Sequence, residues 1–427
     1  MSSLLYPKTS LPGGVDIVSH RLPGRESVAL SVWMRVGSRY EVAEERGISH
    51  FIEHLVFKGT NKRSAKKIKE SIEGKGGLLN AFTSEDSTCF YVKTLKKHLG
   101  FTLEVIADML QNPLFSSVDI EKERTVIIEE LRMYMDMPMH YAHDLISQLL
   151  WPKQPLGSSI AGDVESVSAI TKAQIKDFHK NYYCPQNALI AVCGDLNHDE
   201  VVSAAGNCFR KSSKGIPRKF IKAVSLQKEQ RLMFVNKDTE QTNFVIGMHG
   251  IDRFDTRRYA LGLLHMILGA NMSSRLYEEV REKRGLAYEV RTGINFYDDA
   301  GAFTVSAGVE NDKAEKALVL ILKELDKVRA KGIKKSELER AKEYLLSQLY
   351  FSLEDTMDHM LWLGEKAISN HKIITKEEIA KKVCAATVDD VRSVAEMIFK
   401  NNNLNLVMVG PLPEKKQNLI RKSFRYD

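Results

Sequence analysis

The stretch Ala188-Leu-Ile-Ala-Val-Cys-Gly194-Asp-Leu196, near the middle of the chain, has a counterpart in Val407-Met-Val409-Gly410-Pro-Leu412 near the end. Each is an apolar run of strand length that stops at a glycine, a pattern typical of a buried strand. The two glycines lie 410 − 194 = 216 residues apart. The repetition predicts that one arrangement of elements occurs twice.

The elements that precede these strands repeat as well. A helical pattern at 171–182 precedes the first strand, and one at 387–400 precedes the second. The helix start Glu121-Lys-Glu123-Arg124 returns as Glu337-Leu-Glu339-Arg340, at the same spacing of 337 − 121 = 216 residues. We therefore expect two homologous halves, 1–210 and 231–427, joined by a linker or hinge at 211–230. Two unrelated domains of similar size remain the alternative.

The rest of the chain alternates between strand-like and helix-like stretches, which predicts an α+β fold. The stretches that we expect to form strands are Val28–Val36, Thr88–Thr94, Gln241–Met248 and Ala302–Ala307. The stretches that we expect to form long helices are Leu99–Leu110, Asp119–Leu150, Lys313–Lys331 and Lys335–Ile368.

Length and composition narrow the class of protein. The 427 residues are 43% hydrophobic and 27% charged, as in a globular protein of two or more domains. The net charge of +7 is spread through helices such as that at 66–69, which favours solvated surfaces over a nucleic-acid site. The five cysteines form no C-x-x-C pair, and no apolar run is long enough to span a membrane. With no signal segment at the N-terminus, we expect a bacterial cytoplasmic protein that contacts neither membrane nor nucleic acid.

The segment Gly47-Ile-Ser-His50-Phe-Ile-Glu53-His54-Leu-Val-Phe57 carries the chemistry. Its apolar residues have helical spacing, so His50, Glu53 and His54 fall on one face of a buried helix. Two imidazoles one turn apart can bind one metal ion, while Glu53 acts as a base beside it. A third ligand for this ion must come from elsewhere in the chain. The alternative is that the segment binds no metal, and that its two histidines form only hydrogen bonds beside a surface glutamate.

His50-Phe-Ile-Glu53-His54-Leu-Val-Phe57-Lys58-Gly59-Thr60 resembles the inverted H-x-x-E-H motif of the pitrilysin and mitochondrial processing peptidase family of zinc peptidases. In that family the third ligand is a glutamate about 76 residues past the second histidine, on a helix that begins Glu-Arg. Here 130 − 54 = 76, so the resemblance makes Glu130 the third Zn²⁺ ligand and Glu123 an outer-shell residue. Glu129 points about 100° away from Glu130 on the helix.

Three further stretches resemble the family and imply substrate-binding residues. The segment at 76–83 is similar to a strand that binds an extended peptide through its edge, which implies roles for Asn80, Ala81 and Thr83. The segment at 281–288 is similar to the family's Arg-x6-Tyr signature. It implies that Tyr288 donates to the oxyanion and that Arg281 holds the substrate or orients Tyr288. The loop at 269–274 is similar to a small-residue loop of the second half.

The second half lacks the ligands of the first. Aligning His265 with His54 places Leu261 opposite His50 and Leu264 opposite Glu53, and Leu346 matches Glu130. The resemblance therefore implies a catalytic half at 1–210 and a non-catalytic half at 231–427, each a mainly antiparallel sheet packed with helices and hinged as a clamshell. Long family members carry four such units in one chain. With two units, this chain resembles the short bacterial type, and we expect a homodimer that encloses the substrate peptide.

The function implied is that of a zinc metalloendopeptidase acting on peptides or unfolded segments bound as an extended strand inside a chamber. One alternative is a non-catalytic structural subunit of the same family, although such relatives lose motif residues. Another is a subunit of a heteromeric processing peptidase, whose supporting partner carries a glycine-rich loop; the loop at 269–274 keeps only Gly269. A zinc hydrolase that cleaves a different amide is the third.

Overall fold

The computed structural model describes residues 5–209, 215–369 and 373–426, so positions 211–214 of the expected linker lie outside the described residues. The chain forms two compact units. Unit 1 contains Met1–Leu131, Ser158–Ile221 and Tyr350–Thr375. Unit 2 contains Arg132–Gly157, Lys222–Leu349 and Lys376–Asp427.

Unit 1 is built on a six-stranded sheet of order β1-β2-β6-β3-β5-β4, antiparallel except where β2 runs parallel to β6. Its strands are β1 Lys8–Ser10, β2 Asp16–Arg21, β3 Ser27–Met34, β4 Leu78–Thr83, β5 Thr88–Leu95 and β6 Ala188–Gly194. Its helices are α2 Ile48–Leu55, α3 Ala65–Glu73, α4 Leu99–Gln111, most of α5 Ser117–Asp136, α7 Val164–Ala169, α8 Lys172–Tyr182, α9 His198–Cys208 and α13 Thr356–Ile368.

Unit 2 is built on a five-stranded sheet of order β7-β11-β8-β10-β9, antiparallel except where β7 runs parallel to β11. Its strands are β7 Arg231–Asn236, β8 Gln241–His249, β9 Ala287–Phe296, β10 Gly301–Glu310 and β11 Asn405–Gly410. Its helices are α6 Pro138–Leu150, α10 Arg258–Leu268, the π-helix η7 Tyr277–Glu282, α11 Ala314–Lys331, most of α12 Lys335–Ser352, α14 Lys376–Ala385, α15 Val388–Ile398 and α16 Glu414–Ser423.

These two sheets confirm the α+β class and the repeated order of elements. The repeated apolar runs are β6 and β11, and every residue of each is buried. Each strand has one parallel and one antiparallel neighbour, so the two strands hold equivalent places in their sheets. The four strands expected from alternation are present as β3, β5, β8 and β10, with ends that differ by at most three residues.

Two of the expected helices were wrong as single elements. The stretch 119–150 forms α5 and α6, which are separated at Met137. Pro138 follows, and the residue before a proline is driven out of the helical region, so Met137 is extended. The stretch 335–368 likewise forms α12 and α13. Asp355 is extended there and caps the start of α13 by accepting hydrogen bonds from the amides of residues 357 and 358.

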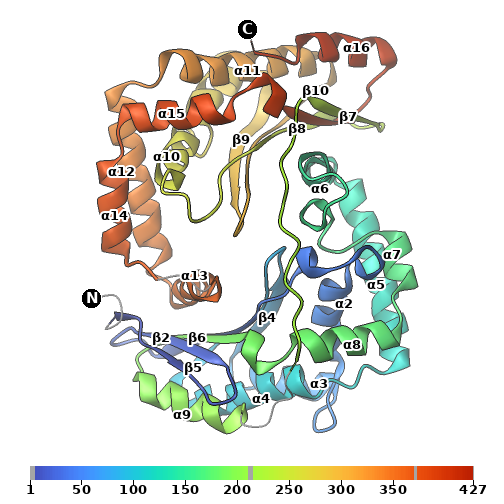
Figure 1. Ribbon diagram of the computed structural model, residues 1–427, viewed down its shortest axis with the longest axis vertical. Coiled ribbons are helices and arrows are strands. Elements are labelled where there is room, and N and C mark those ends of the chain that lie inside the picture. The colour runs from blue at the N-terminus through green and yellow to red at the C-terminus, as the bar shows by residue number, and fades with distance from the viewer. Residues whose placement is uncertain (1–4, 210–214, 370–372, 427) are drawn as a thin grey trace. The chain divides into compact units, whose positions relative to one another are not determined.

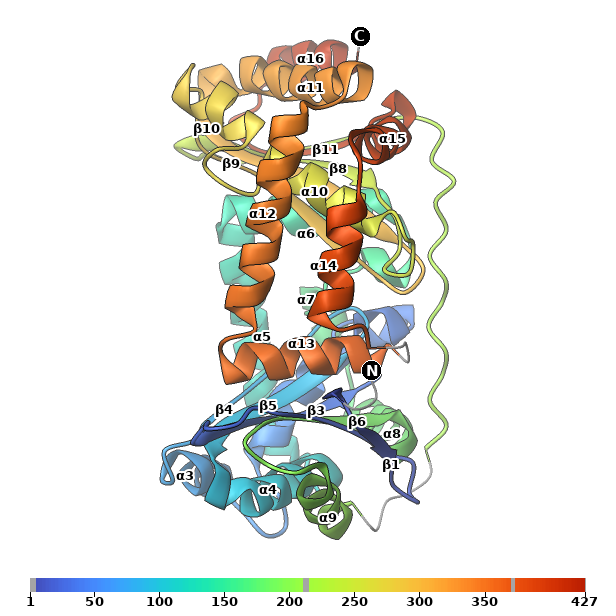
Figure 2. The ribbon, with the colours of Figure 1, turned by 90° about the vertical axis from the view of Figure 1, so that its left-hand side faces the viewer.

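The second piece of each broken helix packs on the sheet of the other half of the sequence. In unit 1, α13 lies across β3 and β6, on the face opposite α4 and α9 (Figure 2). In unit 2, α6 covers β8 and β11 on the face opposite α11 (Figure 1). The central strands β3 and β6 of one sheet, and β8 and β11 of the other, are therefore covered on both faces. The division expected from sequence, at 1–210, 211–230 and 231–427, cuts the chain into consecutive pieces. The compact units are not consecutive, because each contains one helix from the other half of the sequence.

The described part of the linker is attached to each unit by its own contacts. On unit 1, the buried Arg39 places its guanidinium carbon 3.9 Å from the ring centroid of Phe220. On unit 2, the amide of Ala223 donates a hydrogen bond of 2.8 Å to Asp299. Little chain separates these two attachments, and a hinge within 211–230 stays a prediction. Within the described residues, no helix combines the length and apolarity needed to cross a membrane.

The exchanged helices approach their sheets closely at glycines. A Cβ on Gly364 of α13 would lie 2.1 Å from Nε1 of Trp33 in β3. A Cβ on Gly247 of β8 would lie 2.4 Å from Cγ1 of Ile146 in α6. A Cβ at either position would displace a buried side chain. The close packing of α13 and α6 on their sheets therefore requires glycine at these two positions.

We predict that Gly364→Ala lowers the free energy of unfolding by about 1–3 kcal/mol, because the added methyl overpacks the contact between α13 and Trp33. Gly262, inside α10, is the matched control, since a Cβ there meets no atom within 4 Å. Gly262→Ala is expected to stabilise the protein by about 0.5–1 kcal/mol. Denaturant titration of both variants measures the difference, and equal stabilisation by both would contradict the close packing of α13.

Candidate metal centre

Helix α2 carries both histidines of the motif. Its side chains Ile48, Phe51, Ile52 and Leu55 are buried in the core of unit 1. The residues His50, Glu53 and His54 fall on its less buried side, as the helical spacing requires. The burial of the apolar face fixes the rotation of the helix about its axis, and therefore the direction in which the two imidazoles point.

The N-terminus of α2 is held by a buried carboxylate. Glu41 is 3% exposed, and its two oxygens accept hydrogen bonds of 2.8 Å from the amides of Gly47 and Ser49. Burial raises the pKa of Glu41 to about 8, against the lowering effect of these amides. The amides at the start of a helix have no partner within the helix. Glu41 therefore satisfies two of them and fixes the position of α2 along its own axis.

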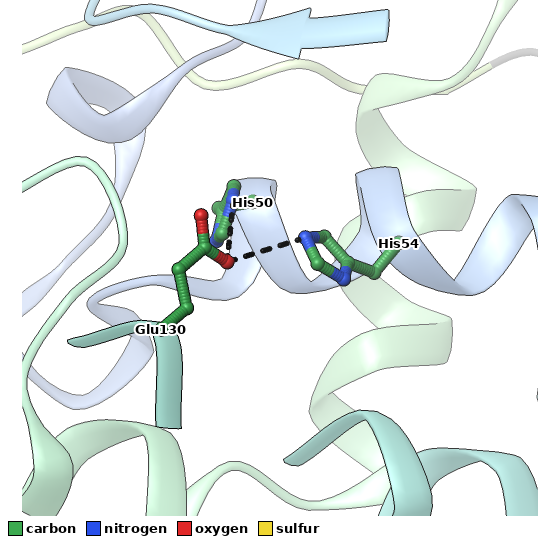
Figure 3. Close-up of side chains that lie close together, drawn as sticks. All are labelled: His50, His54 and Glu130. Atoms are coloured by element: carbon green, nitrogen blue, oxygen red, sulfur yellow. Dashed lines mark ion pairs between the residues drawn. The ribbon is translucent and has the colours of Figure 1, made fainter. Parts of the chain in front are cut away.

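Helix α5 brings the third candidate ligand. Oε2 of Glu130 lies 3.9 Å from Nε2 of His50 and 3.7 Å from Nε2 of His54 (Figure 3). The two imidazole rings lie 4.6 Å apart at 67° to one another. One ligand atom from each of the three residues lies within 4.8 Å of the others. Glu129, the next residue on α5, is exposed, whereas Glu130 is partly buried.

These three side chains fit a zinc ion in chemistry and in spacing. Two imidazole nitrogens and one carboxylate oxygen are a common ligand set for catalytic zinc, which leaves the fourth position open. Ligands bound tetrahedrally at the usual zinc distances stand about 3.3–3.5 Å apart, so the separations of 3.9 Å and 3.7 Å from Glu130 would shorten by about 0.2–0.6 Å on binding. Burial and the neighbouring His54 lower the pKa of His50 to about 4, which keeps its imidazole neutral at neutral pH.

Glu123 lies one helical repeat before Glu130 on α5 and faces the same way. Its Oε2 is 3.2 Å from Nδ1 of His54. With the proton on Nδ1, His54 donates to Glu123 and turns the lone pair of Nε2 toward Glu130. The other oxygen of Glu123 lies 2.6 Å from Nζ of Lys58. The structure thus places Glu123 next to a candidate ligand rather than within the ligand group.

Glu53 also lies outside the ligand group. Its Oε2 accepts a hydrogen bond of 2.5 Å from the hydroxyl of Thr83 in β4. Burial raises the pKa of Glu53, while the hydrogen bond from Thr83 and the charge interaction with His54 lower it. A carboxyl group that binds protons more readily than usual is suited to accept one near neutral pH.

Asn80, Ala81 and Thr83 all lie on β4, an edge strand of the sheet in unit 1. Exposed and partly buried residues alternate along it, and Leu78 is 67% exposed. An edge strand presents unpaired amides and carbonyls to which an extended peptide can add. Because Thr83 contacts Glu53, the same strand reaches the candidate base.

Arg281 and Tyr288 lie in unit 2, at the end of η7 and the start of β9. The guanidinium carbon of Arg281 lies 5.1 Å from the ring centroid of Tyr288 and 4.7 Å from that of Tyr277. Tyr288 is 75% exposed. The two predicted residues therefore contact one another, and their roles toward the metal centre of unit 1 stay predictions.

The corresponding helix of the second half is apolar where the first carries its ligands. Leu261 and Leu264 of α10 are fully buried. His265 places Nδ1 2.6 Å from the hydroxyl of Thr292. Leu346 packs against the same core. Apolar side chains therefore stand at the positions that the alignment of the two halves pairs with His50, Glu53 and Glu130.

Three contacts at the site were not predicted from sequence: the Glu41 cap, the hydrogen bond from Thr83 to Glu53, and the ion pair between Lys58 and Glu123. Lys58 belongs to the motif that resembles the family, so the sequence marks it as a residue of interest, but it does not show that its partner is Glu123. Glu41 lies six residues before Gly47 and carries no pattern that marks it as a cap.

The sequence matches two family profiles in succession. The profile described as Insulinase (Peptidase family M16) matches residues 16–164. The profile described as Peptidase M16 inactive domain matches residues 169–345. The first match contains all the candidate ligands, and the second contains Arg281 and Tyr288 together with the buried leucines of α10.

Relatives and solved structures agree over nearly the whole length. An uncharacterized zinc protease of Streptomyces coelicolor is 35% identical over 420 residues, which are 96% of this chain and 90% of the relative. The zinc protease YmxG of Bacillus subtilis is 34% identical, over 93% of this chain and 96% of its own. A crystal structure of a protease from Helicobacter pylori matches with a TM-score of 0.90 at 26% identity, covering 95% of this chain and 99% of that one. The chain therefore belongs to the M16 family of peptidases, the insulinase family.

Proposed function

We propose that this protein is a zinc metalloendopeptidase that hydrolyses peptides or unfolded segments bound as an extended strand. The observation that carries the proposal is the convergence of His50, His54 and Glu130, with Glu53 beside them and outside the ligand group. The naming of relatives as zinc proteases supports zinc as the metal.

Zinc bound by these side chains would supply a Lewis acid that polarises the peptide carbonyl and makes a bound water acidic. Glu53 takes the proton of the attacking water and delivers it to the leaving amine. Thr83 orients Glu53 through its hydroxyl. Main-chain hydrogen bonds along β4, with Asn80 and Ala81, hold the substrate extended with little demand on its side chains.

The roles of Arg281 and Tyr288 are part of the same proposal. The phenol of Tyr288 donates to the developing oxyanion, and Arg281 holds the substrate or orients the phenol. The contact between Arg281 and the Tyr288 ring supports the orienting role. We propose as well that the active form is a homodimer that encloses the peptide, because one chain carries two units where long family members carry four.

A non-catalytic subunit of the family is the rival proposal. The match to an inactive-domain profile spans residues 169–345, which include the part of the second half that carries Arg281 and Tyr288, and a solved structure from Pseudomonas fluorescens is described by that domain. The presence of His50, Glu53, His54 and Glu130 in the first half favours catalysis, because structural relatives have no use for a ligand set with a base beside it. Activity of the purified chain separates the two proposals.

We predict that Glu130→Gln weakens zinc binding by more than about 100-fold, because the loss of a ligand costs more than the loss of an outer-shell partner. Glu129→Gln is the matched control, since it removes the same charge from the exposed side of the same helical turn. Competition of each metal-free protein with a chromophoric chelator measures the dissociation constant. Equal losses in both variants would remove Glu130 from the ligand set.

We predict that Glu53→Gln keeps about one zinc per chain but lowers cleavage of a quenched fluorescent peptide library by about 10²–10⁴-fold, since it removes the proton acceptor alone. Metal content by mass spectrometry and initial cleavage rates measure the two effects on the same samples. Cleavage by the variant at the wild-type rate would show that Glu53 is not the base. Absence of cleavage by zinc-loaded wild-type protein would favour the non-catalytic subunit.

A further inference from the structure

The end of the zinc motif, Phe57-Lys58-Gly59-Thr60, plays no part in the ligand set or in proton transfer. Yet Lys58 reaches the metal centre through one intermediate residue. Nζ of Lys58 lies 2.6 Å from Oε1 of Glu123, and Nδ1 of His54 lies 3.2 Å from Oε2 of the same carboxylate. Glu123 is therefore held through both of its oxygens, with Lys58 on one and a candidate ligand on the other.

Burial makes this ion pair different from an ordinary surface pair. The side chain of Glu123 is 8% exposed, and that of Lys58 is 32% exposed. A buried carboxylate loses its hydration and requires an opposite charge as well as hydrogen bonds. A neutral imidazole supplies a hydrogen bond but no charge, so of these two partners only Lys58 compensates the charge of Glu123.

The backbone that follows Lys58 fixes the place from which its side chain starts. Lys58 ends a short 3₁₀ turn that continues α2, and Gly59 then adopts φ = +126°, a conformation that favours glycine. The carbonyl of Gly59 accepts from the amide of Leu114 at 3.1 Å. The amide of Thr60 donates to the carbonyl of Arg63 at 2.8 Å.

The side chain of Thr60 attaches this turn to α4. Its hydroxyl donates to the buried Asp108 of α4 at 2.7 Å and accepts from the amides of Lys62 and Arg63. Asp108 also forms an ion pair of 2.7 Å with Arg63. Hydrogen bonds thus tie the turn to α4 and to the segment that precedes α5, which limits movement of the backbone from which the Lys58 side chain starts.

Charge balance points in the same direction. Glu53, Glu123 and Glu130 bring three negative charges to the site, and a zinc ion would bring two positive ones. Lys58 supplies the one remaining positive charge, so these five groups sum to −3 + 2 + 1 = 0. Without Lys58 the same groups would carry a net negative charge in a partly buried place, which favours displacement of Glu123 away from His54.

We propose that Lys58 is a positioning residue of the metal centre. Its ammonium group holds Glu123 in place, and Glu123 in turn holds the proton on Nδ1 of His54 and directs Nε2 toward the metal. Lys58 contacts neither metal nor substrate in this arrangement. The proposal rests on the zinc site of the proposed function, but it does not depend on whether the protein cleaves peptides.

Zinc affinity of the metal-free protein, measured by competition with a chromophoric chelator, tests the proposal without any activity assay. Lys58→Met is expected to raise the dissociation constant about 3- to 10-fold, somewhat less than the loss of a direct outer-shell partner. Lys58→Arg keeps the charge and a donor, and is expected to bind zinc within about twofold of wild type. Lys62→Met is the matched control, because it removes one positive charge from the same loop without contacting Glu123.

A double-mutant cycle shows whether Lys58 acts through Glu123. In a Glu123→Gln background, Lys58→Met is expected to cause no further loss of zinc affinity, because the carboxylate that it positions is gone. The same loss in both backgrounds would overturn the proposal, and so would equal losses in Lys58→Met and Lys62→Met. If Lys58→Met fails to fold, Lys58→Gln replaces it under the same expectations.

The outcomes also separate this proposal from the one on which it rests. Wild-type protein that binds no zinc would overturn both. Zinc binding that is equal in wild type and Lys58→Met would overturn the positioning role alone and leave the metal site intact. Weakened zinc binding in Lys58→Met, restored in Lys58→Arg, would support the role of Lys58 even if the wild-type protein cleaves no peptide.

Discussion

Two candidate ligands and the candidate base come from the single helix α2, so the chemistry of the site depends on how that helix is held. Its apolar face is buried against the sheet of unit 1, which fixes its rotation. Glu41 holds its first amides, which fixes its height. If the sequence were shifted by one residue along the helix, in either direction, the imidazoles would turn by about 100° about the helix axis and move away from Glu130. Packing and capping therefore fix where the two imidazoles point.

The two halves of the chain share one order of strands and helices but differ in the side chains on the equivalent helices α2 and α10. In the first, α2 opens a polar face with two histidines, whose burial is tolerable because each can meet a metal or a carboxylate. In the second, the corresponding helix α10 carries leucines at the aligned positions, and they belong to a continuous core. The exchange of α6 and α13 covers the central strands on the remaining face of each sheet, so neither half of the sequence completes its own core.

The sequence was sufficient for what local spacing determines. The two histidines one turn apart follow from helical periodicity, whereas the strand at β4 and the place of Glu130 on α5 were implied by the resemblance to the family. It was insufficient for what tertiary packing determines. A continuous helical pattern does not show that Met137 breaks it, or on which sheet the second piece packs. Thr83 lies 83 − 53 = 30 residues from its partner Glu53, and Lys58 lies 123 − 58 = 65 residues from its partner Glu123. No local pattern links the members of either pair.

Every role proposed for this site requires that His50, His54 and Glu130 bind zinc while Glu53 and Glu123 do not. A crystal structure of the zinc-loaded Glu53→Gln protein, with anomalous scattering measured at the zinc edge, tests this ligand set. We expect one strong anomalous peak about 2.0–2.2 Å from Nε2 of each histidine and from a carboxylate oxygen of Glu130. Glu123 should remain bound to Nδ1 of His54. A peak coordinated by Glu123, or a fully zinc-loaded crystal with no peak between the two histidines, would rule out this ligand set.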